Sequence, residues 1–573
     1  MKVPADVWTR QFNTPDPPKN VHSVVRPPIR EILTLLPTAM RVGTYIHHER
    51  SHGREPIFDL TGITLAPPNP GPTAGVPCGG IGSGCIGRGF KGDFRRWSLH
   101  PGRYIHRVVP VDQFSIRVRY KNGTVRTQVL STLGSSGSDM PTIPPELSSW
   151  TWSLPSDKAT AYALYPRSWT VYEAPVPGVR VVVKQVSPFL PESYSEASLP
   201  TTAFEVYVEN TLSGSTAGSG ATGNGSEEEE VMEVSVMFTF QNGDGGVEDS
   251  MGGLLHRAFD VDTSSSYEDM TDPRHTEDSD RDSPLGFIRG VVMNHYHQSV
   301  DGGTSLPGSF AIACAEGLSS SSSSSTNGDT NINSISSGGC VTTCPIFITE
   351  GKGARLSSQG ATAATSAITA EQLWTAFRVT GDVSPATNLS SESRNKDVMP
   401  HNEAQGPSRS NGTTATTSTK EGVSQAGTKV AAAVCHRQSI RPGASNARVF
   451  QFSLAWDNPI VQFGPKTSQT SSRTSTTNSN RKASSTPIAA TATSTISASS
   501  GTSSKSSTSP PPPSSSAKIS RYYSRFFGAQ GCAAWAIAVY GLVFGRRWER
   551  RIERWQSTAI AAAAQAWQLI ALT

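Results

Sequence analysis

Residues Gly75–Tyr104 read GVPCGGIGSGCIGRGFKGDFRRWSLHPGRY, and this stretch carries more information than any other part of the chain. Eight of its glycines fall between Gly75 and Gly92, and a charged and aromatic group follows them at once. Glycine permits positive φ and lets another backbone approach closely. Because the run also contains large apolar side chains, it predicts a tightly bent and packed segment, not a flexible linker.

Three interpretations of this stretch stay open. A phosphate-binding loop is the first, but a Walker loop ends in Gly-Lys-Ser/Thr, which is absent, and no helical period follows the Gly80–Gly84 pattern as a dinucleotide fingerprint requires. In the second, the segment is purely structural. Asp93 then pairs with Arg95 or Arg96, and Trp97 fills a domain core. In the third, the loop helps to shape a site made mostly by other parts of the chain.

Short strands with period-two alternation follow. Gln113–Tyr120 (QFSIRVRY) is one, and the turn after it has Asn122-Gly123 at its centre, which favours a hairpin. Further strands are expected at Val125–Leu130, Trp169–Tyr172, Val179–Val186, Phe204–Asn210, Val231–Phe240, Phe287–Tyr296, Ser309–Ala315, Cys344–Thr349, Val430–Gln438 and Arg448–Asp457. So many short strands with hardly any helix between them predict an all-β fold, most simply an antiparallel β-sandwich with a C-terminal helical segment.

Composition divides the chain into segments. Residues 1–70 are Pro-rich and predict an extended lead-in with one short helix within Pro28–Val42, and residues 71–465 hold the sandwich. Tracts rich in Ser, Thr and Gly are predicted to be disordered insertions or linkers, at about 213–230, 318–339, 383–427 and 466–517. An aromatic and basic helical segment at 518–556 precedes an Ala-rich tail at 557–573.

Bulk properties narrow the class of protein. The net charge of +4 is small for 573 residues, so no nucleic-acid partner is implied. The seven cysteines show no zinc-site spacing and predict buried or inert thiols in a reducing compartment. The N-terminus lacks the apolar core of a signal peptide, and no apolar run reaches the roughly 20 residues that span a bilayer. We therefore expect a cytosolic or membrane-peripheral protein without metal or cofactor.

The C-terminal helical segment has two faces. Apolar side chains gather near one side of a helix predicted at Cys532–Trp555, and arginines crowd the other: Arg546, Arg547, Arg550, Arg551 and Arg554. Cations in the last turns suit the helix dipole. One interpretation is a solvated helix face packed on a neighbouring domain. The other is a basic amphipathic helix on an anionic membrane.

A search for catalytic groups finds no constellation. Glycoside hydrolysis needs two carboxyl groups that flank a pocket, but nothing pairs the acids near predicted strands: Asp93, Glu173, Glu205, Glu209, Glu316 and Asp457. No Gly-x-Ser-x-Gly nucleophile elbow occurs. His295 and His297 share one strand face, which is more typical of surface residues than of half a metal site. The residues alone therefore predict no catalytic side chain.

Ordered motifs nevertheless resemble one family, the non-lysosomal glucosylceramidases of glycoside hydrolase family 116. Its N-terminal signature, GVP-x-GG-x-G-x-G, then RG, then G-x-F-x-RW-x-L-x-PG, is matched throughout Gly75–Gly102. Later matches follow in family order, at Tyr165–Arg167, Ser187–Phe189, Phe204–Asn210, Phe240–Gly243, Phe452–Asp457, Phe463–Gly464, Tyr523–Gly528 and Trp548–Gln556.

This resemblance implies an N-terminal β-sandwich that precedes a catalytic (α/α)6 barrel. Members cleave β-glucosides, notably glucosylceramide, with retention, on the cytosolic side of internal membranes. Their Glu nucleophile and Asp acid/base lie in the barrel, and no position here matches either one. After Gln556 the family pattern is replaced by Ala-rich sequence, so the barrel is expected to be missing from a truncated or misread product.

We therefore expect the sandwich domain of a glucosylceramidase-type protein, inactive alone and docked against a barrel supplied in cis. The candidates for its barrel-facing or substrate-proximal surface are Arg88, Asp93, Arg96 and Trp97. The alternative is a non-catalytic module that binds carbohydrate or membrane through exposed aromatic rings and the C-terminal arginines.

Overall fold

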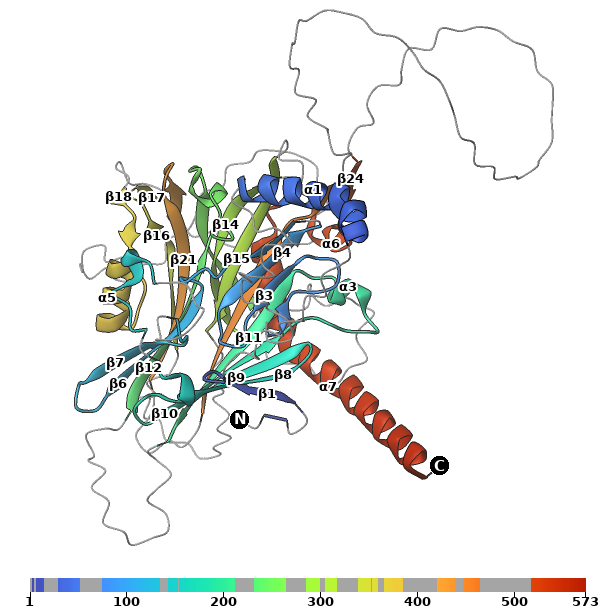
Figure 1. Ribbon diagram of the computed structural model, residues 1–573. Coiled ribbons are helices and arrows are strands. Elements are labelled where there is room, and N and C mark those ends of the chain that lie inside the picture. Colours follow the sequence, from blue (N-terminus) through green and yellow to red (C-terminus); the bar gives the residue numbers. More distant parts are fainter. Residues whose placement is uncertain are drawn as a thin grey trace, which may run out of the picture.

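The computed structural model describes residues 3–4, 7–14, 29–51, 75–101, 103–133, 143–152, 154–211, 231–263, 285–298, 305–316, 339–351, 353–358, 365–384, 420–439, 447–463 and 517–572. Two large sheets dominate it, and helices lie at their flanks (Figure 1).

The larger sheet has twelve strands. In spatial order they are β1 (Trp8–Gln11), β8 (Ala159–Leu164), β9 (Arg167–Val176), β10 (Val179–Val186), β11 (Thr201–Asn210), β22 (Arg448–Asp457), β15 (Ser305–Ala315), β14 (Phe287–Gln298), β13 (Leu255–Asp262), β20 (Lys420–Ser424), β17 (Ala354–Ser358) and β18 (Thr365–Ser366). Every neighbouring pair in it is antiparallel.

The second sheet has six strands. Its order is β19 (Ile368–Thr369), β16 (Cys340–Glu350), β21 (Lys429–Ser439), β12 (Val231–Gln241), β6 (Gln113–Tyr120) and β7 (Val125–Val129). All its pairs are antiparallel except β16 with β19. The predicted all-β, antiparallel class is therefore confirmed.

The main core joins side chains from both sheets. Phe114 of β6 stacks on Phe238 of β12 with ring centroids 4.4 Å apart, and Phe204 of β11 meets the Phe114 ring edge-on at 5.3 Å. Phe452 of β22 adds a further edge contact at 5.6 Å. Aromatic pairs of this kind contribute about 0.5–1.5 kcal/mol each beyond their burial, so this cluster holds the sheets together at their centre.

Strand patterns predicted the core strands well. The observed bounds of β6, β10 and β22 equal the expected ones, because each strand is a long apolar or alternating run. Strand β13 was missed, since the acidic sequence that follows it hid a short alternating pattern. Helix α5 (Ala370–Thr380) was missed as well.

The glycine-rich stretch differs from its expectation. We predicted a bent segment with strands only after it, whereas the stretch itself forms most of a small antiparallel sheet of β2 (Pro77–Cys78), β3 (Cys85–Arg88), β4 (Phe94–His100) and β5 (Arg103–His106). The sharp turns lie between these strands. Trp97 and Phe94 carry β4 into the main core, where each is at most 1% exposed, and that burial makes the segment extended.

Three predicted segment boundaries need correction. Strand β1 lies inside the predicted lead-in 1–70 and pairs with β8, and helix α1 (Ile29–Ser51) is longer than the helix expected within Pro28–Val42. Strand β20 lies inside the predicted insertion 383–427, because it pairs with β13 and β17. The insertion at 213–230, and nearly all of those at 318–339 and 466–517, lie outside the described residues.

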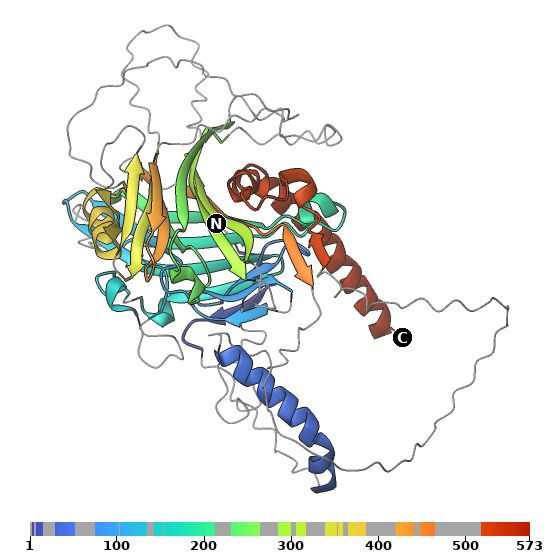
Figure 2. The ribbon, with the colours of Figure 1, turned by 90° about the horizontal axis from the view of Figure 1, so that it is seen from above.

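Helix α7 (Ala534–Leu572) covers the outer face of the larger sheet, on the opposite side of the molecule from α5 (Figure 2). Its buried side chains, Ile537, Leu542, Trp548 and Ile552 among them, form a second core with residues of β14, β15 and β22. The helix runs past the predicted end at Trp555 because alanine has the highest helix propensity. The arginines therefore lie in its middle and not at its C-terminal end. No described helix has the length and hydropathy to cross a bilayer.

Candidate functional site

The candidate site has two features, and the first is the glycine-rich loop, residues 79–84. Trp456 donates its indole N–H to the Ser83 carbonyl at 3.0 Å, and Arg521 donates to the carbonyls of Ser83 and Leu99. The Gly79 amide donates to the Thr202 hydroxyl at 2.9 Å. Because these partners are spread along the whole chain, the loop fastens the small sheet onto the sandwich.

Gly79 is the tightest point of this loop. Its φ is +91°, and a Cβ there would lie 2.4 Å from the Trp456 ring. We expect Gly79→Ala to lower the free energy of unfolding by about 3 kcal/mol, since backbone strain and overpacking each cost about 1–3 kcal/mol. Gly123 is the matched control, because its φ is +82° and nothing lies within 4 Å of the added Cβ. Urea unfolding of both variants checks this, and equal losses would contradict the packing argument.

The four sequence-predicted site residues lie together in this region, but three of them face inward. Asp93 is fully buried and pairs with Arg95, and Trp97 is 1% exposed and donates its N–H to the Arg107 carbonyl at 2.9 Å. Arg88 is buried and donates to Thr170 at 3.3 Å. Only Arg96 is half-buried. The structural interpretation of Asp93 and Trp97 is therefore confirmed, and the barrel-facing or substrate-proximal role of the four residues stays a prediction.

One of the two histidines proposed as surface residues also needs correction. His295 of β14 is 5% exposed and packs against the Phe310 ring at 5.6 Å. The side chain of His297 lies outside the described residues. Among the described residues no group of His, Cys, Asp and Glu is arranged to hold a metal ion.

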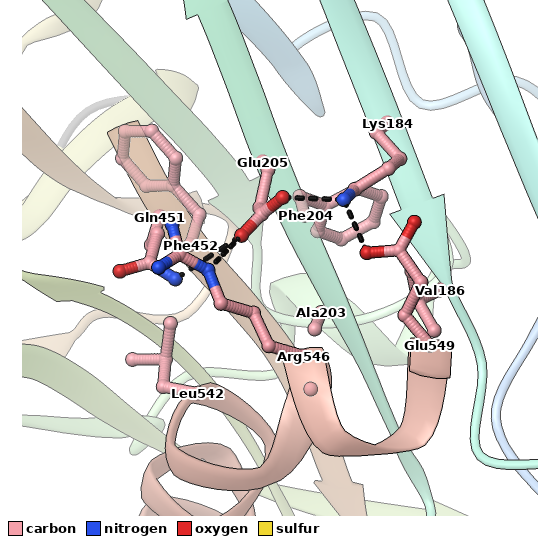
Figure 3. Close-up of a pocket in the computed structure, with 11 residues that line it drawn as sticks. Lys184, Val186, Ala203, Phe204, Glu205, Gln451, Phe452, Leu542, Arg546 and Glu549 are labelled. Carbon is pink, nitrogen blue, oxygen red and sulfur yellow. Dashed lines mark hydrogen bonds and ion pairs between the residues drawn. The ribbon is translucent and has the colours of Figure 1, made fainter. Parts of the chain in front are cut away.

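The second feature is a charged seam between α7 and the larger sheet (Figure 3). Lys184 of β10 lies 2.5 Å from Glu205 of β11 and also pairs with Glu549 of α7. Arg546, one helical turn before Glu549, donates its Nε–H to Glu205 at 2.7 Å. Charges thus alternate along the seam from Arg546 through Glu205 and Lys184 to Glu549.

Further ion pairs extend the seam along the helix. Arg167 at the start of β9 lies 2.5 Å from Glu553 and donates to the Gln556 side chain at 2.7 Å. Arg551 pairs with Glu196, which also accepts the Trp548 N–H at 3.1 Å. Residues 546, 549, 553 and 556 recur at the spacing of one helix face. That face meets the sheet. Arg546 on it, and Arg551 beside it, are therefore engaged with acids of the domain itself.

Burial and neighbouring charges set the ionisation of the seam. Burial by itself raises the pKa of Glu205, but the cations of Lys184 and Arg546 outweigh it and lower the pKa to about 2. Burial by itself lowers the pKa of Lys184. The carboxylates of Glu205 and Glu549 have the larger, opposite effect, so the pKa of Lys184 lies above its ordinary value. Glu205 is therefore an anion, and Lys184 a cation, across the physiological range of pH.

This arrangement can fix a helix but cannot cleave a glycoside. The space at the centre of the seam is about 10 Å³, which is the room that a single water molecule needs. Glu205 cannot donate a proton at neutral pH, and cations cover its oxygens. Since buried ion pairs add little net stability, we infer that the seam sets the position of α7 on the sheet.

The sequence patterns identified Glu205 as an acid near a predicted strand but gave no partner for it. They did not identify Lys184, Arg167 or Glu549 as site residues. One signal was available, because a lysine inside the apolar run VRVVVKQV requires a buried anion. Lys184 and Glu205 are directly opposite each other in the β10–β11 register. The helix partners lie more than 300 residues further along the chain, and no local pattern identifies them.

Comparison with known families agrees with this architecture. A family model described as beta-glucosidase 2, glycosyl-hydrolase family 116 N-term matches residues 75–548. The match begins at the first glycine of the quoted stretch and ends inside α7, so it includes the glycine-rich loop and, of the charged seam, Lys184, Glu205 and Arg546. It spans most of the chain and agrees with the ordered motifs found in the sequence. The chain therefore belongs to glycosyl-hydrolase family 116 and carries the N-terminal domain of its β-glucosidases.

Proposed function

We propose that this domain is the non-catalytic N-terminal β-sandwich of a glucosylceramide-cleaving β-glucosidase and releases no glucose by itself. The resemblance supports glucosylceramide as the substrate and the cytosolic face of internal membranes as the location. A separate catalytic domain, joined in cis, then supplies the two reacting carboxyl groups.

The observation that carries the proposal is the state of the buried acids. A retaining glycosidase needs an accessible carboxylate and a protonated acid about 5 Å apart. Glu205 and Glu196 instead have cations and other donors on their oxygens. Asp457 accepts the Tyr523 hydroxyl at 3.0 Å and the Ala533 amide at 2.8 Å, at the start of α7. These acids hold the fold and α7 together.

An exposed aromatic surface supports the docking role. Tyr194 lies 4.6 Å from Tyr522, and Tyr522 lies 5.7 Å from Phe526, measured between ring centroids. Tyr194 and Phe526 are each more than half exposed, and Ile81 of the glycine-rich loop is 45% exposed. Grouped apolar side chains on a surface mark interaction sites. We propose the catalytic domain as the partner that covers them.

The membrane alternative has less support. Arg546 and Arg551, two of the arginines that it needs, form ion pairs with Glu205, Glu192 and Glu196 of the sandwich. A cation that is already paired within the domain contributes less to attraction by anionic lipid.

The test is a glycosidase assay on the purified chain. We expect no glucose release above a matched blank from glucosylceramide or from an aryl β-glucoside, because Glu205, Glu196 and Asp457 are already engaged within the fold. Cooperative urea unfolding of the same sample shows that it is folded. Turnover that Glu205→Gln abolishes would overturn the proposal, since it would make the seam catalytic. Turnover that survives this variant would overturn it too and place the active carboxyl groups elsewhere.

A further inference from the structure

A second cavity lies away from the α7 seam, at one end of the six-stranded sheet. Strands β12 and β16 end there, and β21 begins there. Its volume is about 430 Å³, within the range of about 300–1,000 Å³ that small-molecule sites occupy. We call it the β12 cleft. It is too large to be a packing defect, and it shares no lining residue with the seam.

One wall of the β12 cleft is apolar. It is built by the connection between β5 and β6, including Val108 and Val109, and by the turn that contains Pro144 and Pro145. The lining also includes Gln241, Thr349 and the ends of the neighbouring strands. A ligand that matches this lining presents C–H groups on a face and hydrogen-bonding groups along its edges.

Gln241 is held in place from two directions. Its backbone N–H donates to Asp112 at 2.7 Å, and its amide Nε2 donates to Asp249 at 3.2 Å. Its Oε1 accepts from Thr349 at 3.4 Å. A glutamine amide has two donor hydrogens and two acceptor positions, and these side-chain bonds use one of each. The amide is therefore preorganised, with one donor and one acceptor left to offer.

The charges at the cleft point to a neutral ligand. Lys429 lies 2.6 Å from Glu350, and Arg107 lies 3.4 Å from Asp244, so each cation already faces a carboxylate. Glu146 adds an exposed carboxylate at the rim, which accepts hydroxyl hydrogens. An anionic ligand would have to displace an internal partner. A polyhydroxylated ring can form hydrogen bonds with both the cation and the carboxylate of such an ion pair, and it need not displace either one.

We propose that the β12 cleft is an accessory site for a neutral pyranoside, with the glucosyl unit of a β-glucoside as its ligand. The pyranose ring has apolar faces and hydroxyl groups at its edge, which matches a lining that combines apolar residues with hydrogen-bonding side chains. This inference goes beyond the proposed function because it assigns ligand binding to the sandwich. It requires no hydrolysis, so its failure and the failure of the proposed inactivity are separate outcomes.

The test uses methyl β-D-glucopyranoside and the purified full chain, with ligand-observed NMR as the readout. We expect a dissociation constant of about 1 mM, the value that ordinary ligand efficiency gives for a molecule of this size. Replacing both Lys429 and Glu350 by alanine removes one ion pair of the polar lining and should weaken binding about tenfold or more. Val108→Phe, which adds a ring to the apolar wall, should also abolish binding.

The matched control is another cross-strand ion pair. Arg257 of β13 and Glu421 of β20 lie 2.8 Å apart, are both exposed, and do not line the cleft. Replacing both by alanine should leave binding unchanged. The proposal fails if the unmodified chain does not bind the glucoside, or if the cleft variants bind as well as the control. It also fails if the chain binds N-acetylglycine methylamide, a neutral peptide analogue, and not the glucoside.

Discussion

Replacing Lys184 by methionine is expected to lower the free energy of unfolding by about 3 kcal/mol, the low end of the cost of removing one partner from a buried ion pair. The ammonium group lies between Glu205 and Glu549, and the Lys184 side chain is 4% exposed. Methionine keeps the length of the side chain but leaves two carboxylates without their shared cation. The loss stays at the low end because Arg546 still pairs with Glu205, and Arg167 lies 3.7 Å from Glu549.

A matched pair on the same two strands provides the control. Arg180 of β10 and Glu209 of β11 lie 2.8 Å apart and are directly opposite each other in the register, but each side chain is 23% exposed. Arg180→Met should therefore cost no more than about 1 kcal/mol, as for surface ion pairs. Urea unfolding followed by tryptophan fluorescence measures both variants. Equal losses would contradict the claim that burial makes the seam important.

The Lys184→Met variant should also weaken the attachment of α7 to the sheet. Amide hydrogen exchange should rise along Ala534–Ile552 in Lys184→Met, because the ion pairs that hold the helix on the sheet are weakened there. A double-mutant cycle with Glu205→Gln isolates the pairwise energy of Lys184 and Glu205. Faster exchange spread evenly over both sheets would instead indicate a general loss of stability, and not a seam that positions the helix.

Acid is expected to destabilise the domain through two buried histidines. His256 donates from Nδ1 to the Pro345 carbonyl at 2.8 Å and accepts from Asn242 at Nε2, a tautomer inferred from these partners. Burial lowers the pKa of His256 and that of His436 to about 4, against an ordinary value of 6.5. A lowered histidine pKa gives stability that is present above pH 6.5 and is lost as the pH falls toward 4. Each histidine should therefore remove about 2 kcal/mol between about pH 7 and pH 5.

His436→Leu tests this prediction against the other titrating groups. Burial raises the pKa of Asp112 and of Asp249, which has the opposite effect on stability, but these acids are present in both proteins. The free energy of unfolding of the variant should therefore fall by about 2 kcal/mol less than that of the unmodified chain over this range. His47→Leu, at an exposed position of α1, is the control. Parallel pH profiles for all three proteins would refute the prediction.

Local patterns predicted the elements that local physics controls. The alternation in QFSIRVRY and the apolar run VRVVVKQV specify strands wherever they lie, because a strand with one or two buried faces needs that pattern. Helix α5 was predictable in the same way and was overlooked. Thr369 and Gln372 form a capping box, and Gly381 ends the helix with a φ of +78°, and both are visible as sequence signals.

Partnerships between distant segments were not predictable in this way. Arg88, Asp93 and Trp97 look like surface chemistry in the sequence, because charged and aromatic residues beside glycines are typical of binding loops. In the fold they are interior, where Arg88 bonds to Thr170, Asp93 pairs with Arg95, and Trp97 donates to the Arg107 carbonyl. Whether a charge is buried depends on what packs over it, and that is a property of the whole chain.

The sequence by itself determined core strands such as β6, β10 and β22, the family, and the bends of the glycine-rich stretch, because hydrophobic period, motif order and positive-φ positions can be read from the chain itself. Only the tertiary structure decided that Lys184 and Glu205 meet Arg546 and Glu549, and that a cleft opens beside Gln241. The reason is physical. A buried charge or an enclosed space exists only when segments hundreds of residues apart pack together and exclude water.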